Sequence, residues 1–141
     1  MAFSGEYQHS IDEKGRLIVP AQFRDSLGVK FMLQKGQEGC LNAYPMGVWT
    51  GLEEKLNALH DFSRTNRNLK RRFFSGSREC EIDRQGRALI QQEFRSYGKL
   101  TKEAYIVGAG DHVEIWDKET WESFRDSLDA EYEALAEVVF Q

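Results

Sequence analysis

The sequence is poor in the residues that build disulfides and metal sites. It contains two cysteines, three histidines and two prolines in 141 residues. Cys40 and Cys80 form no C-x-x-C motif and do not occupy equivalent positions, so we expect reduced, partly buried thiols. The histidines are equally scattered, and no spacing of ligand residues predicts a metal site.

Long apolar runs and common catalytic patterns are also missing. No stretch reaches the roughly 18 apolar residues of a membrane-spanning helix, and the segment Met-Ala-Phe-Ser-Gly-Glu at the start lacks a basic and a hydrophobic region. We therefore expect no signal peptide, no membrane span and a cytoplasmic protein. There is no Ser-His-Asp ordering, no phosphate-cradling glycine loop and no carboxylate pair with an obvious partner. These gaps argue against an enzyme, a cofactor and a small-molecule ligand.

Charge is unevenly distributed along the chain. The formal net charge is −4, but residues 111–141 hold ten acids against Lys118 and Arg125, a net of −8. Residues 1–110 therefore carry +4. Only this basic part needs to approach a polyanion, so the overall negative charge does not exclude a nucleic-acid partner.

One pattern, D-x-x-G-R, occurs at Asp12–Arg16 and again 71 residues later at Asp83–Arg87. Aligned at that offset without gaps, the surrounding segments share nine of 22 positions: Phe3/Phe74, Ser4/Ser75, Gly5/Gly76, Ile11/Ile82, Asp12/Asp83, Gly15/Gly86, Arg16/Arg87, Phe23/Phe94 and Arg24/Arg95. Composition alone does not explain so many identities. We therefore expect two copies of one unit, residues 1–73 and 74–141, that share a core.

Hydrophobic periodicity predicts similar elements in both units. The expected strands cover residues 3–11, 17–19, 30–34, 40–44, 74–82, 88–90, 104–107 and 112–116. Short helices are expected over 21–27 and 93–97, an amphipathic helix from Trp49, and a cationic helix over about 63–73.

The last helix is expected to begin at Asp117, a candidate N-cap. It carries an apolar stripe at spacings of three and four: Trp121, Phe124, Leu128, Tyr132, Leu135 and Val139. Such a stripe is typical of core or of a subunit interface rather than of a ligand site.

The two D-x-x-G-R segments have residues suited to a sharp turn. Gly15 and Gly86 can adopt the positive φ that closes a short hairpin or bulge. Asp12 and Asp83 can accept hydrogen bonds from the backbone two residues ahead, so these four residues are predicted to fix the turns. Two cations flank each glycine and would stand near the hairpin tips: Lys14, Arg16, Arg84 and Arg87.

The two turns are followed by the runs Leu-Ile-Val-Pro and Ala-Leu-Ile, and a later strand ends in Val-Glu-Ile-Trp. In these features the chain resembles the MraZ family over essentially its whole length. The resemblance implies an α+β fold of two tandem AbrB-like β-rich units, forming a pseudo-two-fold, β-barrel-like core with flanking helices. It implies ring-shaped homo-oligomers, expected to be octamers. It also implies a nucleoid-associated transcriptional regulator of the bacterial division and cell-wall gene cluster, which includes the protein's own operon.

The residues themselves permit a DNA contact. A guanidinium can bond bidentately to O6 and N7 of guanine in the major groove, with about 1–3 kcal/mol of discrimination. We therefore predict that Arg16 and Arg87 contact bases, while Lys14 and Arg84 hold phosphates. Two alternatives remain open. Each arginine pairs only with the aspartate of its own turn, or that aspartate orients the arginine for its base.

The cations leave further alternatives open. The second turn has Arg84-Gln85 where the first has Glu13-Lys14, so the two turns need not contact DNA identically. The run from Arg64 to Arg72 contains no acid and is a competing phosphate-binding surface, but a solvated face or pairing with the acidic last helix is favoured. The alternative to a DNA-binding regulator is a structural or scaffolding ring that binds an acidic protein or nothing.

Overall fold

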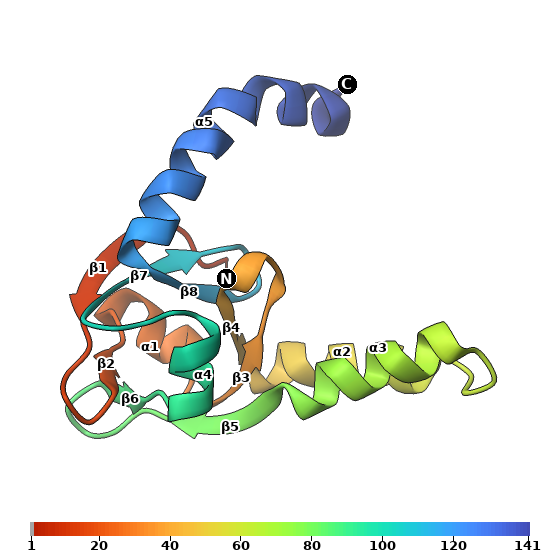
Figure 1. Ribbon diagram of the computed structural model, residues 1–141, viewed down its shortest axis with the longest axis horizontal. Coiled ribbons are helices and arrows are strands. Elements are labelled where there is room, and N and C mark those ends of the chain that lie inside the picture. Colours follow the sequence, from red (N-terminus) through yellow and green to blue (C-terminus); the bar gives the residue numbers. More distant parts are fainter. Residues whose placement is uncertain (1) are drawn as a thin grey trace.

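The computed structural model describes residues 2–141 and shows an α+β fold built on a six-stranded antiparallel sheet (Figure 1). The strands are β1 (Glu6–Ser10), β2 (Arg16–Ile18), β3 (Lys30–Lys35), β4 (Leu41–Pro45), β5 (Ser77–Glu81), β6 (Arg87–Leu89), β7 (Glu103–Gly108) and β8 (Val113–Asp117). The helices are α1 (Ala21–Leu27), the short 3-10 helix η1 (Gln37–Gly39), α2 (Met46–Asn57), α3 (Arg64–Ser75), α4 (Gln92–Tyr97) and α5 (Lys118–Phe140). The α+β class expected from the sequence is confirmed.

Strands of the two sequence repeats are exchanged within the sheet, whose order is β1-β7-β8-β4-β3-β5. β1 of the first repeat pairs with β7 of the second, and β5 of the second pairs with β3 of the first. The two halves join at the centre, where Leu41 of β4 lies opposite Ile115 of β8. Among the described residues the sheet ends at β1 and β5 and does not close into a barrel, so a barrel-like core is not confirmed.

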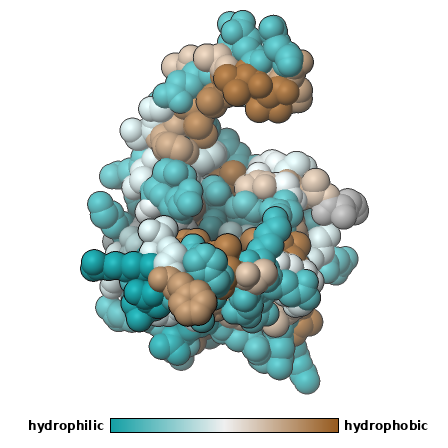
Figure 2. All heavy atoms as spheres, turned by 90° about the vertical axis from the view of Figure 1, so that its right-hand side faces the viewer, coloured by the Kyte–Doolittle hydropathy of each residue, from teal (hydrophilic) through white to brown (hydrophobic). Residues whose placement is uncertain are grey.

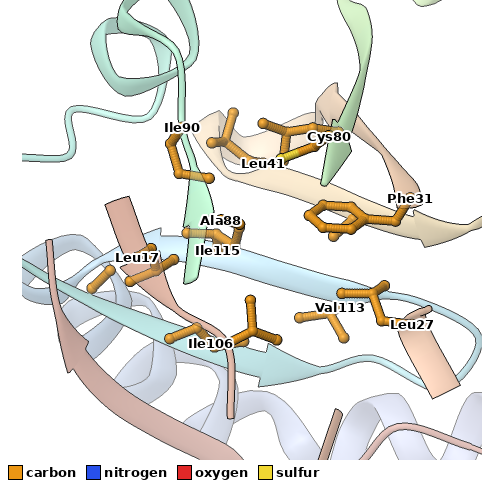
Figure 3. Close-up of a cluster of buried hydrophobic side chains, with 14 of the residues drawn as sticks. Leu17, Leu27, Phe31, Leu41, Cys80, Ala88, Ile90, Ile106, Val113 and Ile115 are labelled. Atoms are coloured by element: carbon orange, nitrogen blue, oxygen red, sulfur yellow. The ribbon is translucent and has the colours of Figure 1, made fainter. Parts of the chain in front are cut away.

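The main core lies between the sheet, the separate β2–β6 ladder and the short helices α1 and α4 (Figure 3). Leu17 and Ala88 face each other in the ladder and are each 1% exposed. Phe23 of α1 and Phe94 of α4 hold equivalent repeat positions and are fully buried. Burial of a large apolar side chain contributes about 1.5–3 kcal/mol relative to exposure. The ladder is therefore anchored to the same core as the sheet.

Most expected elements lie within one to three residues of their predicted bounds, and α1 matches 21–27. The strand predicted over 74–82 begins only at Ser77, because α3 occupies the start of that range. Phe73 of α3 stacks on Trp49 of α2 with ring centroids 5.0 Å apart, which favours continuation of the helix. In the first repeat, Phe3 forms an isolated antiparallel bridge instead. The first identities in the alignment of the two repeats, Phe3/Phe74 and Ser4/Ser75, therefore lie in different local structures.

Helix α5 projects away from the body of the molecule (Figure 1). Asp117 caps it by accepting a hydrogen bond from the Thr120 amide at 3.1 Å, and Phe124 stacks on Trp116 with centroids 4.9 Å apart. Its second half is unpacked, and apolar side chains gather there (Figure 2): Tyr132, Leu135, Val138, Val139 and Phe140. The predicted stripe is thus core near the sheet and exposed apolar surface beyond it. Within residues 2–141, no helix combines the length and apolar character needed to cross a membrane.

Candidate nucleic-acid interface

The first D-x-x-G-R turn joins β1 to β2 and is closed by Asp12. Its Oδ1 accepts hydrogen bonds from the backbone N–H groups of Lys14 and Arg16, at 3.0 and 2.9 Å. Its Oδ2 accepts a hydrogen bond from Nε of Arg16 at 2.7 Å. Gly15 has a φ of +86°, a left-handed conformation that residues with a Cβ adopt only with strain. One carboxylate and one glycine therefore hold the turn in shape.

The second turn repeats this geometry between β5 and β6. Oδ1 of Asp83 accepts from the backbone N–H groups of Gln85 and Arg87, both at 2.9 Å. Oδ2 accepts from Nε of Arg87 at 3.1 Å, and Gly86 has a φ of +79°. The same hydrogen bonds form at both positions because the aspartate, glycine and arginine recur at the same spacing.

The two turns lie side by side at one end of the molecule (Figure 1). The strands that leave them form the antiparallel β2–β6 ladder. Beyond the ladder, the Gly15 carbonyl accepts a hydrogen bond from the Ile90 amide at 2.9 Å, and the Gly86 carbonyl accepts one from the Val19 amide at 2.8 Å. Each turn is therefore bonded to the other repeat, and one chain presents both turns together.

Each glycine also lies against an arginine of the other repeat. A Cβ on Gly15 would lie 2.8 Å from Cζ of Arg95, and a Cβ on Gly86 would meet the guanidinium of Arg24 still more closely. Nε of each arginine donates at 2.8 Å to a backbone carbonyl of its own repeat, which fixes its position. No role was predicted for these arginines from the sequence. Their only signal was the Arg24/Arg95 identity between the repeats.

Arg16 and Arg87 are partly exposed, with side-chain exposures of 32% and 27%. Both pair with the aspartate of their own turn through Nε, which both of the open alternatives require. In the part of the chain that the structure describes, neither arginine uses its terminal nitrogens Nη1 and Nη2 in a hydrogen bond to protein. An exposed ion pair contributes only about 0–1 kcal/mol to stability. The ion pair therefore matters more for orientation than for stability: it fixes the guanidinium through Nε and leaves the terminal nitrogens Nη1 and Nη2 able to donate to a ligand.

The remaining cations make this end of the molecule positive. Lys14 and Arg84 are exposed near the tips of the turns. The two turns and the arginines that lie against their glycines supply six cations in all: Lys14, Arg16, Arg84, Arg87, Arg24 and Arg95. The turns contain three acids: Asp12, Glu13 and Asp83. A cationic surface on a rigid support is complementary to a polyanion even though the whole chain carries a charge of −4.

The acids of the turns stay ionised. The backbone N–H of Arg16 is the largest cause that lowers the pKa of Asp12, and the Arg16 side chain adds to it. The backbone N–H of Arg87 acts in the same way on the pKa of Asp83. The carboxylates therefore keep their hydrogen bonds at neutral pH and do not titrate as catalytic acids would.

The basic run on α3 lies on a different side of the molecule from the turns (Figure 1). Nζ of Lys70 bonds Oδ1 of Asp61 at 2.8 Å, and Nη1 of Arg67 donates to the carbonyl of the same aspartate at 2.8 Å. Nη1 of Arg72 donates to the Lys35 carbonyl at 3.2 Å. Among residues 2–141, no ion pair joins α3 to α5. The run therefore does not extend the cationic end formed by the turns.

The cysteines are free and buried, and burial raises the pKa of Cys40 to about 12 and that of Cys80 to about 11. Both thiols are therefore protonated at neutral pH. No group of three or more His, Cys, Asp or Glu side chains within the described chain is placed to hold a metal ion.

The fold and the site together define a class: a double-repeat, β-rich protein that presents two equivalent cationic turns from one end. A family model described as "MraZ protein, putative antitoxin-like" matches residues 2–72 and 73–140. The chain belongs to the MraZ family. It is similar to the "Transcriptional regulator MraZ" of Moorella thermoacetica, with 51% identity over 136 residues that cover 96% of this chain and 94% of the relative.

A second relative leads to the same family. The "Transcriptional regulator MraZ" of Pelotomaculum thermopropionicum is 50% identical over 137 residues, covering 97% of this chain and 94% of the relative. Both names describe transcriptional regulators, and neither is the name of an enzyme.

Proposed function

We propose that this protein is a sequence-specific DNA-binding transcriptional regulator that reads DNA with its paired turns. One observation carries the proposal: Arg16 and Arg87 are fixed through Nε, and their terminal nitrogens remain available on adjacent turns. The names of the relatives support the same class. We further propose that the protein acts in the cytoplasm, on the nucleoid.

The chemistry of the proposed contact follows from the donors that each side chain offers. The two terminal nitrogens of a guanidinium match O6 and N7 of guanine in the major groove. Arg16 and Arg87 would read bases in this way, while Lys14 and Arg84, exposed at the tips, would hold phosphates. Asp12 and Asp83 fill the orienting role, because each fixes its arginine and its turn through separate oxygens.

The turns are also stiff, which reduces the cost of binding. The glycine of each turn is bonded to the other repeat and lies against Arg24 or Arg95. Side chains held in one geometry before binding lose less conformational entropy when the complex forms. In this proposal, residues 1–73 and 74–141 are two AbrB-like units with a barrel-like core, and each supplies one of the two turns.

A single pair of turns makes few contacts, so we propose that affinity comes from a ring-shaped homo-oligomer, with an octamer expected from the family. Several subunits would bind repeated short DNA boxes at once, which raises affinity without a new type of contact. The exposed apolar stripe on α5 supports assembly, because surfaces of this kind mark protein–protein contacts. The regulated genes would be the division and cell-wall cluster, including the protein's own operon.

The second candidate is a scaffolding ring whose cationic turns bind an acidic protein. The exposed apolar end of α5 favours an assembly but does not favour this partner over DNA. The doubled turn geometry favours DNA, because guanidinium donors fixed twice in one chain suit a repetitive ligand.

A footprint on the DNA upstream of the protein's own operon tests the proposal. We expect the wild type to protect short repeated boxes and Arg16→Ala to protect none, with folding and assembly unchanged. Arg64→Ala is a suitable control, since it removes an exposed cation from α3, away from the turns. Unchanged protection by Arg16→Ala would overturn the assignment. Full activity in cells by a form unable to bind DNA would favour the scaffold.

A further inference from the structure

The β2–β6 ladder has an outer face that the core does not use. In each three-residue strand the middle side chain, Leu17 or Ala88, is 1% exposed and belongs to the core. Successive side chains of a strand point to opposite faces, so the first and third residues of both strands share the other face. This outer face comprises Arg16, Ile18, Arg87 and Leu89.

Two aliphatic side chains therefore stand beside the two arginines. Ile18 is 37% exposed and Leu89 is 51% exposed. In the register of the ladder, Leu89 lies opposite Arg16 and Ile18 lies opposite Arg87. Each aliphatic side chain therefore neighbours an arginine across the ladder, with Cβ atoms about 5 Å apart. Neither aliphatic residue is part of the buried core, so packing within the chain does not account for them.

We infer that Ile18 and Leu89 contact thymine methyl groups in the same DNA box whose guanines bind Arg16 and Arg87. The inference rests on the proposed function and deepens it. A two-stranded β-ladder fits the major groove, where thymine displays a C5-methyl group to apolar side chains. The charges around the outer face favour DNA as the ligand. The turns and their supporting arginines carry six cations against three acids, which attract a polyanion and repel another cationic surface.

The two contacts differ in their surroundings. Leu89 also lines a cavity of about 220 Å³ bordered by Arg78, Glu79 and Glu81, so part of its surface faces that cavity instead of a ligand on the outer face. The larger methyl effect is therefore expected at Ile18. Residues two apart on an antiparallel strand are about 6.8 Å apart, and base pairs rise about 3.4 Å. The guanine and the thymine read by Arg16 and Ile18 thus lie within about two base-pair steps.

The test uses full-length protein and a duplex containing the footprinted boxes. Each thymine is replaced singly by deoxyuridine, which removes the methyl group and keeps the base pair. Dissociation constants are measured by fluorescence anisotropy at one salt concentration for the wild type, Ile18→Ala, Leu89→Ala and Arg16→Ala. Val29→Ala is the matched control, because Val29 is an exposed aliphatic residue outside the outer face, at 68% exposure.

We expect one deoxyuridine to weaken wild-type binding about fourfold, the effect of one buried methyl-sized group. Ile18→Ala loses the contact at every box, so it should bind the thymine duplex about fourfold more weakly per bound box. It should also be indifferent to that deoxyuridine, while Val29→Ala should behave as wild type. The inference fails if Arg16→Ala loses binding but no deoxyuridine affects the wild type, and the proposed function then still stands. It also fails if Ile18→Ala changes the assembly size and keeps full deoxyuridine sensitivity, because the face then contacts another subunit. Unchanged binding by Arg16→Ala removes the proposed function itself.

Discussion

The two D-x-x-G-R turns share their geometry and differ in their charge. In both, one aspartate oxygen accepts two backbone N–H groups, and the other accepts Nε of the arginine. The first turn, Asp12–Arg16, contains two acids and two bases, whereas the second, Asp83–Arg87, contains one acid and two bases. The shared residues therefore set the shape of the turn, while the positions between them are free to vary the contact with a ligand.

This separation suits two turns that read one polyanion in different ways. The tip cation is the third residue of the first turn, Lys14, but the second residue of the second turn, Arg84. If the arginines Arg16 and Arg87 read bases, the tips would reach different phosphates along the backbone. Substitutions in the two turns can therefore show where they are equivalent and where they are not.

The largest effect is expected from Arg16 and Arg87, the two arginines proposed to read bases. Arg16→Ala and Arg87→Ala should each remove about 1–3 kcal/mol of base discrimination per contact. If several subunits bind together, as proposed, the losses multiply, and specific binding should disappear in either variant. Arg16→Lys and Arg87→Lys are controls that keep the charge but lose the bidentate geometry. Gel shifts with box DNA and with scrambled DNA should show that the lysine variants keep only the non-specific binding.

That result would establish the two turns as equivalent readers. If Arg87→Ala left specific binding intact while Arg16→Ala removed it, the first turn alone would carry recognition, and the second would serve as its support.

A smaller effect is expected from the glycines, measured as the free energy of unfolding in urea. Gly39→Ala is the matched control, because Gly39 has a φ of +80° but nothing lies within 4 Å of its added Cβ. It should lose about 1–2 kcal/mol from backbone strain alone. Gly15→Ala and Gly86→Ala should lose about 2–4 kcal/mol, because they also displace a guanidinium. Gly86→Ala should lose the most, since Arg24 lies closer to it than Arg95 does to Gly15.

Equal losses in all three glycine variants would mean that the arginines move aside without cost. Arg24 and Arg95 would then be bystanders rather than supports of the turns.

The tip cations should change the salt dependence of binding more than its specificity. Each phosphate contact contributes a slope of about −0.9 to the plot of log affinity against log salt. Lys14→Ala and Arg84→Ala should each make the slope shallower by about that amount per bound subunit, with the same boxes protected. Replacing Glu13-Lys14 by Arg-Gln would give the first turn the charge pattern of the second. An altered box preference in that variant would contradict the assignment of these cations to phosphates.

Local chemistry made the turns predictable from the sequence. An aspartate that bonds the backbone ahead of it and a glycine at positive φ need only their own neighbours, so Asp12–Arg16 and Asp83–Arg87 could be interpreted residue by residue. The short strands after the turns followed for the same reason, because their apolar residues are adjacent in sequence.

Contacts between the repeats were not predictable in this way. Periodicity marks a strand but does not name its partner, so the exchange of β1 and β5 between the repeats was missed. Arg24 and Arg95 were missed for a related reason, since each acts on a turn far away in the sequence. The identity of Phe3 and Phe74 led to a predicted start of β5 that is too early, because packing of Phe74 against Trp49 keeps that part of the second repeat helical.

The smallest expected effect concerns the strength of the Asp–Arg pair, where the two turns differ slightly. The pKa of both Asp12 and Asp83 is lowered from 3.8, first by a backbone N–H and also by the arginine side chain. A lowered pKa in the folded state gives stability that is present above 3.8 and is lost as the pH falls through the folded-state pKa. The free energy of unfolding in urea should therefore fall as the pH becomes acid. The fall should be smaller in Asp12→Asn, which has one fewer carboxylate to protonate.

The arginine's share of this shift can be separated by NMR titration of the carboxyl groups. Nε of Arg16 lies 2.7 Å from Oδ2 of Asp12, whereas Nε of Arg87 lies 3.1 Å from Oδ2 of Asp83. Arg16→Ala should therefore raise the pKa of Asp12 by more than Arg87→Ala raises that of Asp83. Neither variant should restore the ordinary aspartate pKa, because the backbone N–H groups still bind the other carboxylate oxygen. If the pKa did return fully, the ion pair and not the backbone would hold the turn, and every arginine substitution would then have to be interpreted as a change of turn shape.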